Sequence, residues 1–455
     1  MKKKLSFKEV LLVGSLLFGL YFGAGNLIFP LELGQKSGVN LTPVTIGFLL
    51  SGVGLPILGI VATGLSDSES LFESAKPAGD FFAYFFTILL YLTIGPGFAI
   101  PRTATVSYEV GLKGLVGAND SLYLLIFSII FFLLAYLFAV KKGNLIDTIG
   151  KYMTPIFLIL LALIAILGFI KPMGLVASID PTKEYQTSPF TAGFIDGYNT
   201  LDAPASLAFA VLIIAAIKKL GVTEPADIGR EVLKAGIVCL IAMGVVYSSL
   251  AYLGSTSAHI MDGGENGAII LAKISNHYLG SFGHILLSLI VFIACLKTAI
   301  GLISACSEMF SEMLSSNISY KQYCIIFVIV SFLIANLGLT RIISLSIPVL
   351  MFLYPLSIAL IFLSMVSIKT GKRETIYKWT LGLTAFAAFF DLLVNLPESI
   401  SKSNFVTNIL TFPNKYLPGF SLGFGWIIPT ILGFVIGYMI DKAKNKSKVT
   451  YTTGK

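Results

Sequence analysis

The chain has 455 residues, of which 56% are hydrophobic and 12% charged, and its formal net charge at pH 7 is +8. This composition excludes a soluble globular domain and a disordered chain, and it indicates a protein that crosses a membrane several times. Because no soluble region remains to bind nucleic acid, the positive charge favours contact with the anionic headgroups of the lipid bilayer.

Many segments of the chain are apolar over about 18 residues or more, the length that predicts a membrane-spanning helix. They lie near residues 8–36, 42–65, 81–110, 121–140, 152–171, 190–217, 232–254, 281–310, 322–339, 342–366, 377–396 and 421–440. Such runs are too long for the strands of an outer-membrane barrel, which alternate polar and apolar residues in pieces of about ten. The sequence therefore predicts an all-α polytopic membrane protein with about 12 transmembrane helices.

The first segment contains Gly-Ala-Gly-Asn at residues 23–26, with no charged residue beside it. A bilayer offers no water to unpaired backbone groups, so an interrupted helix is stable there only where it lines a cavity. In secondary transporters the freed amides and carbonyls of such an interruption bind substrates and ions. We predict an interrupted helix here, with a binding site beside it.

The third segment carries a cation and a carboxylate seven residues apart, Arg102 and Glu109. Charged side chains inside a membrane helix are costly and usually functional. Two interpretations stay open for Arg102. It is either a cation of an outer gate, with Glu109 as the second gating residue, or an anchor near the helix end that reaches the interface.

The sixth segment is interrupted by Gly197, Asp202 and Pro204, because proline removes a backbone donor and clashes with the preceding turn. This second break lies five helices after the first, which favours a fold of two inverted five-helix repeats with broken helices 1 and 6. The predicted repeats cover residues 1–171 and 190–366. Two peripheral helices follow at 377–440 and a cytoplasmic tail at 441–455.

The basic residues predict the orientation. If both termini are cytoplasmic, 22 of the 32 lysines and arginines lie on the inner side of the membrane and 8 on the outer side. Such a bias is typical of cytoplasmic loops. We therefore predict a multi-pass membrane protein with both termini in the cytoplasm.

The sequence contains no signature of an enzyme or of a tightly bound cofactor. Phosphate-binding loops, metalloprotease motifs and nucleophile elbows are missing, and the cysteines lie in apolar segments where they act as small hydrophobic side chains. The three histidines fall in a predicted outer loop after the seventh segment and at the start of the eighth, with no metal-site spacing. No obligate protein partner is evident. A secondary transporter is favoured over a passive channel or a membrane enzyme.

Several motifs together resemble one family. They are GLYFGAGNLIFP in the first segment, TIGPGFAIPRTATVSYEVG in the third, GYNTLDAPASLAF in the sixth, ACLKTAIGLISACSE in the eighth and NLGLTRIISLSIPVL across the ninth and tenth. Over nearly its full length the chain resembles the bacterial branched-chain amino acid:cation symporters. The resemblance implies the LeuT-like fold of the sodium-coupled amino acid symporters. It also implies uptake of leucine, isoleucine and valine driven by Na⁺ or H⁺.

A zwitterionic substrate then explains both breaks. Amides near Gly25 and Asn26, at a half-helix N-terminus, suit the substrate carboxylate, and the carboxylate of Asp202 with nearby carbonyls suits its ammonium group. The residues expected to bind substrate are Phe22, Gly23, Ala24, Gly25, Asn26, Asn199, Leu201, Asp202 and Ala205.

The resemblance also implies places for the coupling ion. A Na⁺ site would combine the carbonyls of Gly19 and Phe22 with the hydroxyl of Thr298, and a second site would combine Asn26 with Thr200. Position 297 departs from what we expect of the family, because it is lysine. Its ammonium group either replaces the Na⁺ ion, which would make transport sodium-independent or proton-linked, or turns toward a carboxylate or the interface.

Overall fold

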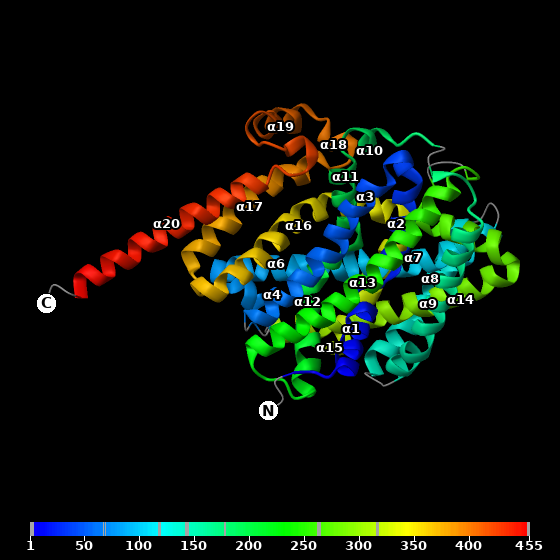
Figure 1. Cartoon of the computed structure of the whole chain (residues 1–455), viewed down its shortest axis with the longest axis horizontal. Coiled ribbons are helices and arrows are strands. Elements are labelled where there is room, and N and C mark those ends of the chain that lie inside the picture. The colour runs from blue at the N-terminus through cyan, green and yellow to red at the C-terminus, as the bar shows by residue number, and fades with distance from the viewer. Residues whose placement is uncertain are drawn as a thin grey trace.

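The computed structural model describes residues 4–66, 68, 70–116, 120–141, 145–176, 179–261, 265–314 and 318–452. These residues form helices and turns and no strand (Figure 1). The predicted all-α fold is therefore confirmed.

Each of the predicted apolar segments contains one helix or a set of consecutive helices. In the first half of the chain these are α1 (Phe7–Tyr21), α2 (Ala24–Ser37), α3 (Leu41–Leu49), α4 (Leu55–Leu65), α6 (Asp80–Leu92), α7 (Ala99–Gly111), α8 (Asp120–Lys141) and α9 (Leu145–Ile170). In the second half they are α11 (Pro189–Asp196), α12 (Asp202–Lys219), α13 (Pro225–Ser257), α14 (Gly267–Met313), α15 (Tyr320–Ala335), α16 (Leu339–Thr370), α17 (Glu374–Val394) and α20 (Ile427–Thr452). Short helices connect them: α5 (Leu71–Ala75), α10 (Lys183–Thr187), α18 (Glu398–Ser401) and α19 (Asn404–Tyr416).

The first predicted break is present between α1 and α2. A capping box starts α1, in which the Ser6 hydroxyl accepts from the Glu9 amide and the Glu9 carboxylate accepts from the Ser6 amide at 2.7 Å. The helix ends because Phe22 and Gly23 are extended, and α2 begins at Ala24. Its first amides, which have no partner within the helix, therefore start at the break.

The second predicted break is present between α11 and α12. A 3-10 turn, η7 (Gly197–Thr200), ends α11, and Leu201 follows it in the left-handed conformation with φ of +66°. A residue other than glycine rarely adopts this backbone conformation, so the surrounding packing must hold Leu201 in it. Asp202 is the first residue of α12, and the two helices are bent by 46°.

Other interruptions were not predicted. A π-helical turn, η2 (Leu50–Gly54), joins α3 to α4, and a second one, η4 (Thr93–Gly97), joins α6 to α7 through the non-helical Gly95. The predicted outer loop before the eighth segment is partly wrong, because α14 already begins at Gly267 and bends at Gly280, where φ is +62°.

Two helix pairs pack backbone against backbone around the breaks. In the pair α2 and α13, a Cβ on Gly34 would lie 2.0 Å from the Ala251 carbonyl oxygen, and one on Gly254 would lie 2.1 Å from that of Leu31. The pair α3 and α11 repeats this arrangement with Gly47 against Phe190 and Gly193 against Val44, at 2.1 and 2.0 Å. Small residues allow such close approach of membrane helices, so one half-helix from each break, α2 and α11, packs closely against a neighbouring helix.

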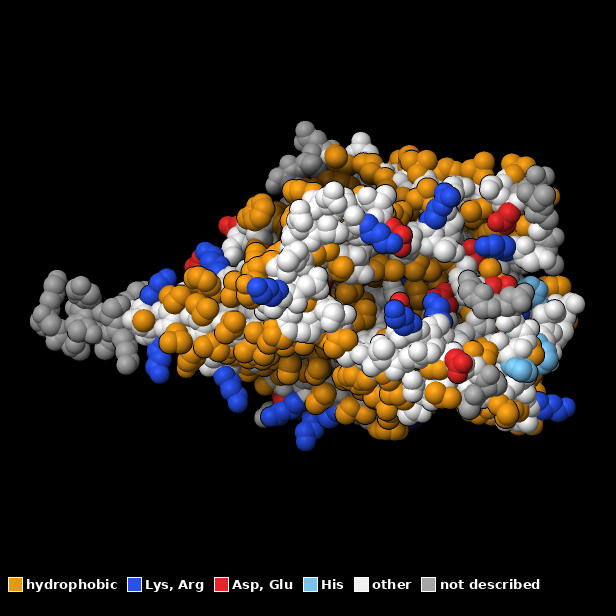
Figure 2. Space-filling model, turned by 90° about the horizontal axis from the view of Figure 1, so that it is seen from above, with side chains coloured by type: hydrophobic (Ala, Val, Ile, Leu, Met, Phe, Trp, Pro, Cys, Tyr) orange, Lys and Arg blue, Asp and Glu red, His pale blue; other side chains and the backbone are white. Residues whose placement is uncertain are grey.

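The surface suits a bilayer. Seven helices of the described residues are long and apolar enough to cross a membrane, and the bent pair α11–η7–α12 makes an eighth. Large apolar side chains are exposed around the outside, for example Phe81 of α6, Ile159 of α9 and Val245 of α13. Figure 2, seen from the end that carries α19, shows hydrophobic side chains along both long sides, with basic and acidic side chains between them. The total of about twelve spans stays a prediction.

The helices α16, α17 and α20 lie together on one side of the molecule, with α18 and α19 over their upper end (Figure 1).

The cysteines are buried at Cys239 in α13, Cys295 and Cys306 in α14, and Cys324 in α15. Of the predicted cytoplasmic tail, residues 453–455 lie outside the described residues.

Candidate functional site

Three polar side chains join the two breaks. The Asn26 amide nitrogen of α2 donates to the Asp202 carboxylate of α12 at 2.7 Å and also to the Tyr247 hydroxyl of α13. The Tyr247 hydroxyl donates to the same carboxylate oxygen at 3.1 Å, and the Asn26 carbonyl accepts from the Gly23 amide at 3.1 Å. Asn26, Asp202 and Tyr247 are at most 3% exposed. Buried polar groups that satisfy one another in this way fix a unique arrangement.

Arg102 brings a positive charge to the same place. Its guanidinium donates to the Asn199 carbonyl of η7 at 2.6 Å and to the Ser346 hydroxyl of α16 at 3.5 Å, and it lies 5.0 Å from the centre of the Phe29 ring. A Cβ on Gly25 would lie 3.2 Å from its Nη1 atom, so the guanidinium faces the start of α2. Arg102 is 2% exposed, so it is not an anchor that reaches the interface.

One cation and one carboxylate thus lie beside the unwound backbone. Arg102 and Asp202 are close enough to interact electrostatically. A guanidinium and free amides at the start of α2 suit an anionic group, and a buried carboxylate suits an ammonium group. The arrangement is complementary to a small zwitterion.

The apolar residues predicted for the substrate side chain divide between two places. Phe22 is half-buried and stacks on Phe18 with ring centres 4.9 Å apart, and Ala205 packs in the main core. Leu201 packs instead in a smaller cluster with Tyr198 and Tyr354. Ala24 and Gly25 are buried in the first turn of α2.

The residues predicted for the coupling ion lie around the first break. Thr298 of α14 places its methyl carbon 3.6 Å from the position of a Cβ on Gly23, and its hydroxyl donates to the Ala294 carbonyl at 3.1 Å. A Cβ on Gly19 would meet no atom within 4 Å, so open space adjoins that residue. Lys297 is half-buried. Because successive helical residues point about 100° apart, Lys297 leaves α14 in a different direction from Thr298.

The two residues predicted for the second ion site, Asn26 and Thr200, are already engaged in contacts within the protein. The Thr200 hydroxyl donates to the Gly197 carbonyl at 2.9 Å and accepts from the Asp202 amide at 3.4 Å. Asn26 already uses both ends of its amide group. No group of three or more His, Cys, Asp or Glu side chains within the described residues is placed to hold a metal ion.

Glu109 lies apart from Arg102, near the other end of α7. Its carboxylate accepts from Lys113 at 2.9 Å and from the Asn266 amide at 2.5 Å, where Asn266 caps the start of α14. On the same helix start, the Gly267 amide donates to Glu32 of α2 at 2.8 Å. Two carboxylates thus tie α2 and α7 to the start of α14.

Three contributors were not predicted from the sequence: Tyr247, Phe29 and Ser346. Each lies in an apolar helix where a single tyrosine, phenylalanine or serine carries no distinguishing pattern.

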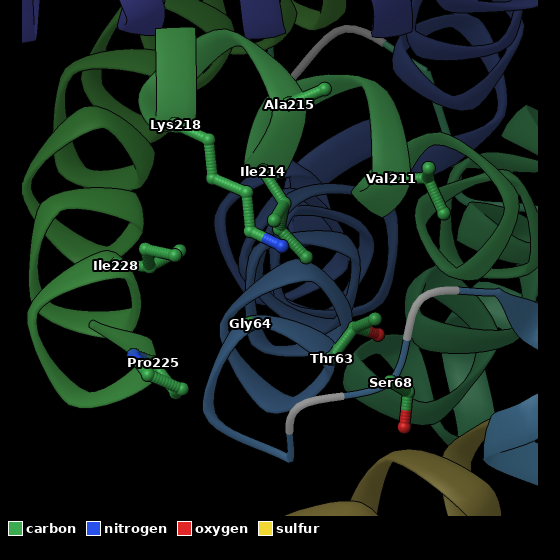
Figure 3. A pocket seen from close by; sticks show the side chains of 9 residues that line it. All are labelled: Thr63, Gly64, Ser68, Val211, Ile214, Ala215, Lys218, Pro225 and Ile228. Atoms are coloured by element: carbon green, nitrogen blue, oxygen red, sulfur yellow. The ribbon is translucent and has the colours of Figure 1, made fainter. Parts of the chain in front are cut away.

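A cavity of about 240 Å³ also lies between α4, α12 and the start of α13, with the Lys218 amine pointing into it (Figure 3). None of the predicted site residues lines this cavity, so it is separate from the breaks.

The comparison with known families identifies the chain. Residues 6–444 match the family described as branched-chain amino acid transport protein. The chain belongs to this family. As a member of the branched-chain amino acid transport family, the protein is a membrane transporter and not an enzyme.

The curated relatives extend over the whole chain. A branched-chain amino acid permease, BrnQ, of Lactobacillus delbrueckii subsp. lactis is 42% identical, over 96% of this chain and 97% of the relative. The permeases BrnQ and BraB of Bacillus subtilis (strain 168) are each 40% identical over 98% of this chain, and the matches cover 100% and 99% of these relatives.

Solved structures show the same fold. The inward-facing conformation of Mhp1 matches with a TM-score of 0.62 over 95% of this chain and 91% of that one, at 12% identity. A closed conformation of Mhp1 with bromovinylhydantoin bound matches with a TM-score of 0.53, also at 12% identity, over 96% and 93% of the two chains. The protein therefore has the LeuT-like fold that the family resemblance implied.

Proposed function

We propose that the protein imports leucine, isoleucine and valine across the bacterial cytoplasmic membrane by alternating access, coupled to Na⁺ or H⁺. The observation that carries this proposal is the hydrogen-bonded network of Asn26, Asp202 and Tyr247, which joins both helix breaks with Arg102 beside it. The names of the curated relatives support the substrate class.

The zwitterion is bound by its two charges. Its carboxylate faces the guanidinium of Arg102 and the free amides at the start of α2, near Gly25 and Asn26. Its ammonium group faces Asp202 and the backbone carbonyls of η7. Because Asp202 and Arg102 already have protein partners, substrate binding exchanges contacts within the site rather than filling vacant ones.

We place the branched side chain between the two groups of apolar residues, with Phe22 and Ala205 on one side and Leu201 on the other. One methylene changes binding in an apolar pocket by only about 1 to 3 kcal/mol. Leucine, isoleucine and valine therefore share the site, and more polar amino acids are excluded.

Alternating access requires closure at one end while the other opens. We assign the outer closure to Glu109 and Glu32, because both accept hydrogen bonds from the start of α14.

Both termini are then cytoplasmic, and the two repeats cover 1–171 and 190–366. The matching glycine contacts of α2 with α13 and of α3 with α11 support this internal symmetry.

Two coupling schemes remain. In the first, Na⁺ binds the carbonyls of Gly19 and Phe22 and the hydroxyl of Thr298, beside the open space at Gly19. In the second, the ammonium group of Lys297 takes the place of Na⁺ and transport is sodium-independent or proton-linked.

Leucine uptake into proteoliposomes tests the proposal, with Na⁺ and H⁺ gradients imposed separately. We expect saturable accumulation of intact leucine driven by one of the gradients, and competition by isoleucine and valine. Uptake that never exceeds the outside concentration under either gradient would point to a channel, and chemically altered leucine would point to an enzyme.

The variant Lys297→Thr separates the two schemes, with the exposed Lys402→Thr as a matched control. If Lys297 replaces Na⁺, the wild type ignores a Na⁺ gradient and the variant gains a response. Sodium-stimulated uptake by the wild type would exclude the second scheme.

A further inference from the structure

A second buried aspartate lies outside the site described above. Asp391 is in the last turn of α17 and 1% exposed, and neither oxygen of its carboxylate has a hydrogen-bond partner. A buried carboxyl group without partners is unusual, because burying its charge is costly when nothing compensates for it.

Two further polar atoms without partners gather beside it. They are the hydroxyl of Tyr198 in η7 and the indole nitrogen of Trp426, just before α20. The phenol of Tyr198 is close enough to both Asp391 and Trp426 to interact with them. The Tyr198 phenol is thus within interaction range of buried polar groups from two other parts of the chain.

The described neighbours supply no charge to balance Asp391. The elements packed against α17 are α16, α19, α20 and the 3-10 turn η3 (Lys76–Ala78). The titratable groups that face the cluster from α16 and from η7 are the phenols of Tyr354 and Tyr198. Arg373 and Asp441 pair with each other at the opposite end of α17, about 27 Å from Asp391 along the helix. The other charged residues of these elements whose side chains the structure describes are exposed: Lys76, Arg341, Lys369, Lys415, Lys442 and Lys444.

We propose that Asp391 is a proton-binding site and that its protonation state controls the second helix break through Tyr198. Protonation adds H⁺ from water to one carboxylate oxygen, and release returns it to water. This inference rests on the proposed transport function and makes the proton a ligand of the transporter.

The two protonation states require different hydrogen bonds. Neither set is made in this structure. A neutral Asp391 gains a partner when its hydroxyl turns to donate to the oxygen of Tyr198, whereas an ionised Asp391 gains partners when Tyr198 and Trp426 turn to donate to it. Tyr198 therefore reorients between the states. Its ring stacks on Tyr354 with centres 4.0 Å apart, so the reorientation disturbs a packed contact.

The second break lies directly next to this switch. Tyr198 is followed by Asn199, whose carbonyl holds Arg102, and the Tyr354 hydroxyl donates to the Gly197 carbonyl at 3.4 Å. A shift of Tyr198 thus reaches the backbone that faces the substrate. Asp391 also lies at the end of α17 that leads to α18 and α19, which is the outer side in the orientation proposed above.

Tryptophan fluorescence tests the proton site directly. The chain has two tryptophans, Trp379 and Trp426, and Trp379 is exposed on α17. In the full-length Trp379→Phe variant, reconstituted in nanodiscs, Trp426 is the sole reporter. We expect its emission to change in one step between about pH 4 and about pH 10. The step should vanish in Asp391→Asn, persist with a shifted midpoint in Asp391→Glu, and remain in the exposed control Glu398→Gln.

Saturating leucine then tests the coupling. We expect it to move the midpoint by about 0.5 pH unit or more, which equals a threefold change in leucine affinity between the two protonation states. Tyr198→Phe should keep the titration and lose this shift.

The outcomes separate the two proposals. Emission without a step, or a step that survives Asp391→Asn, would overturn the proton site. A midpoint that leucine leaves unchanged, in protein shown by calorimetry to bind leucine, would overturn the coupling. A protein that titrates at Asp391 but binds no leucine would overturn the transport proposal and would still support the proton site.

Discussion

The two buried aspartates of the bundle differ in their surroundings. Asp202 at the second break accepts hydrogen bonds from Asn26 and Tyr247 and has Arg102 near it. Asp391, three residues before the end of α17, is as well buried but has no partner for either oxygen. Burial alone therefore does not set the role of a membrane carboxylate. Partners lessen the cost of a buried charge, which suits the role proposed for Asp202 toward a cationic group, whereas their absence leaves that cost uncompensated, which suits the proton site proposed at Asp391.

Neutralising each aspartate gives the largest expected difference. In the proposed binding mode, Asp202→Asn removes the carboxylate that faces the substrate ammonium group and also disturbs the network with Asn26 and Tyr247, so leucine binding should weaken by about 100-fold or more. Asp391→Asn resembles the protonated residue, so leucine binding near neutral pH should change by less than about threefold. Binding of labelled leucine to purified protein measures both. Equal losses in the two variants would remove the distinction.

Replacing each aspartate by leucine compares stability rather than binding. Asp202→Leu leaves Asn26 and Tyr247 buried without their acceptor, which should lower the free energy of unfolding by about 2 to 3 kcal/mol. Asp391→Leu removes an unpaired polar group and keeps the branching of the side chain, so it should be neutral or stabilising by about 1 kcal/mol. Thermal denaturation in detergent checks the sign. A strongly destabilised Asp391→Leu would mean that Asp391 has a partner, such as bound water.

The two phenols that face the aspartates should differ less. Tyr247→Phe removes a hydrogen bond to the Asp202 carboxylate, which is worth about 1.5 kcal/mol and predicts roughly tenfold weaker leucine binding. Tyr198→Phe removes a hydroxyl that has no partner, so leucine affinity at fixed pH should change by less than about twofold. Calorimetric titration with leucine measures both affinities, and the reverse order would contradict the assignment of Tyr247 to the site.

Much of the fold follows from patterns that any membrane protein must show. Apolar length predicted the helical segments, and Gly-Ala-Gly-Asn and Asp202 with Pro204 predicted the two breaks, because unpaired backbone in a bilayer must serve a cavity. The Gly-Pro-Gly at 95–97 carried a similar signal for the π-helical turn η4. A helix before the eighth segment was missed because residues 267–279 are mixed in polarity.

The partners within the site were harder to predict. Arg102 was visible as a charge inside a membrane segment, but its contact with the Asn199 carbonyl depends on how α7 packs against η7. Asp391 carried the same signal, a charge inside the segment at 377–396, but it was not singled out, and Tyr247 gave no local pattern. The sequence alone indicates which polar residues are unusual, whereas tertiary packing decides which of them have partners.

A third buried carboxylate, Glu109, gives the comparison an intermediate point and the smallest expected effect. It has partners in Lys113 and Asn266, but it lies near the end of α7 and not at a break. Glu109→Gln keeps the shape and weakens the bond to Asn266, at a cost of about 0.7 kcal/mol. The outer closure should then form less readily, so the maximal rate of leucine uptake should fall about threefold while leucine affinity stays unchanged.

The matched control for Glu109 is Glu398→Gln, because Glu398 forms an exposed ion pair with Lys402 at 2.8 Å. Exposed pairs of this kind contribute little, so neither rate nor affinity should change. If Glu109→Gln weakens leucine affinity as much as Tyr247→Phe does, Glu109 belongs to the binding site and not to the closure. If instead the rate is unaffected, the hydrogen bond to Asn266 has no part in gating, and satisfied carboxylates distant from the breaks serve only to hold α7 against α14.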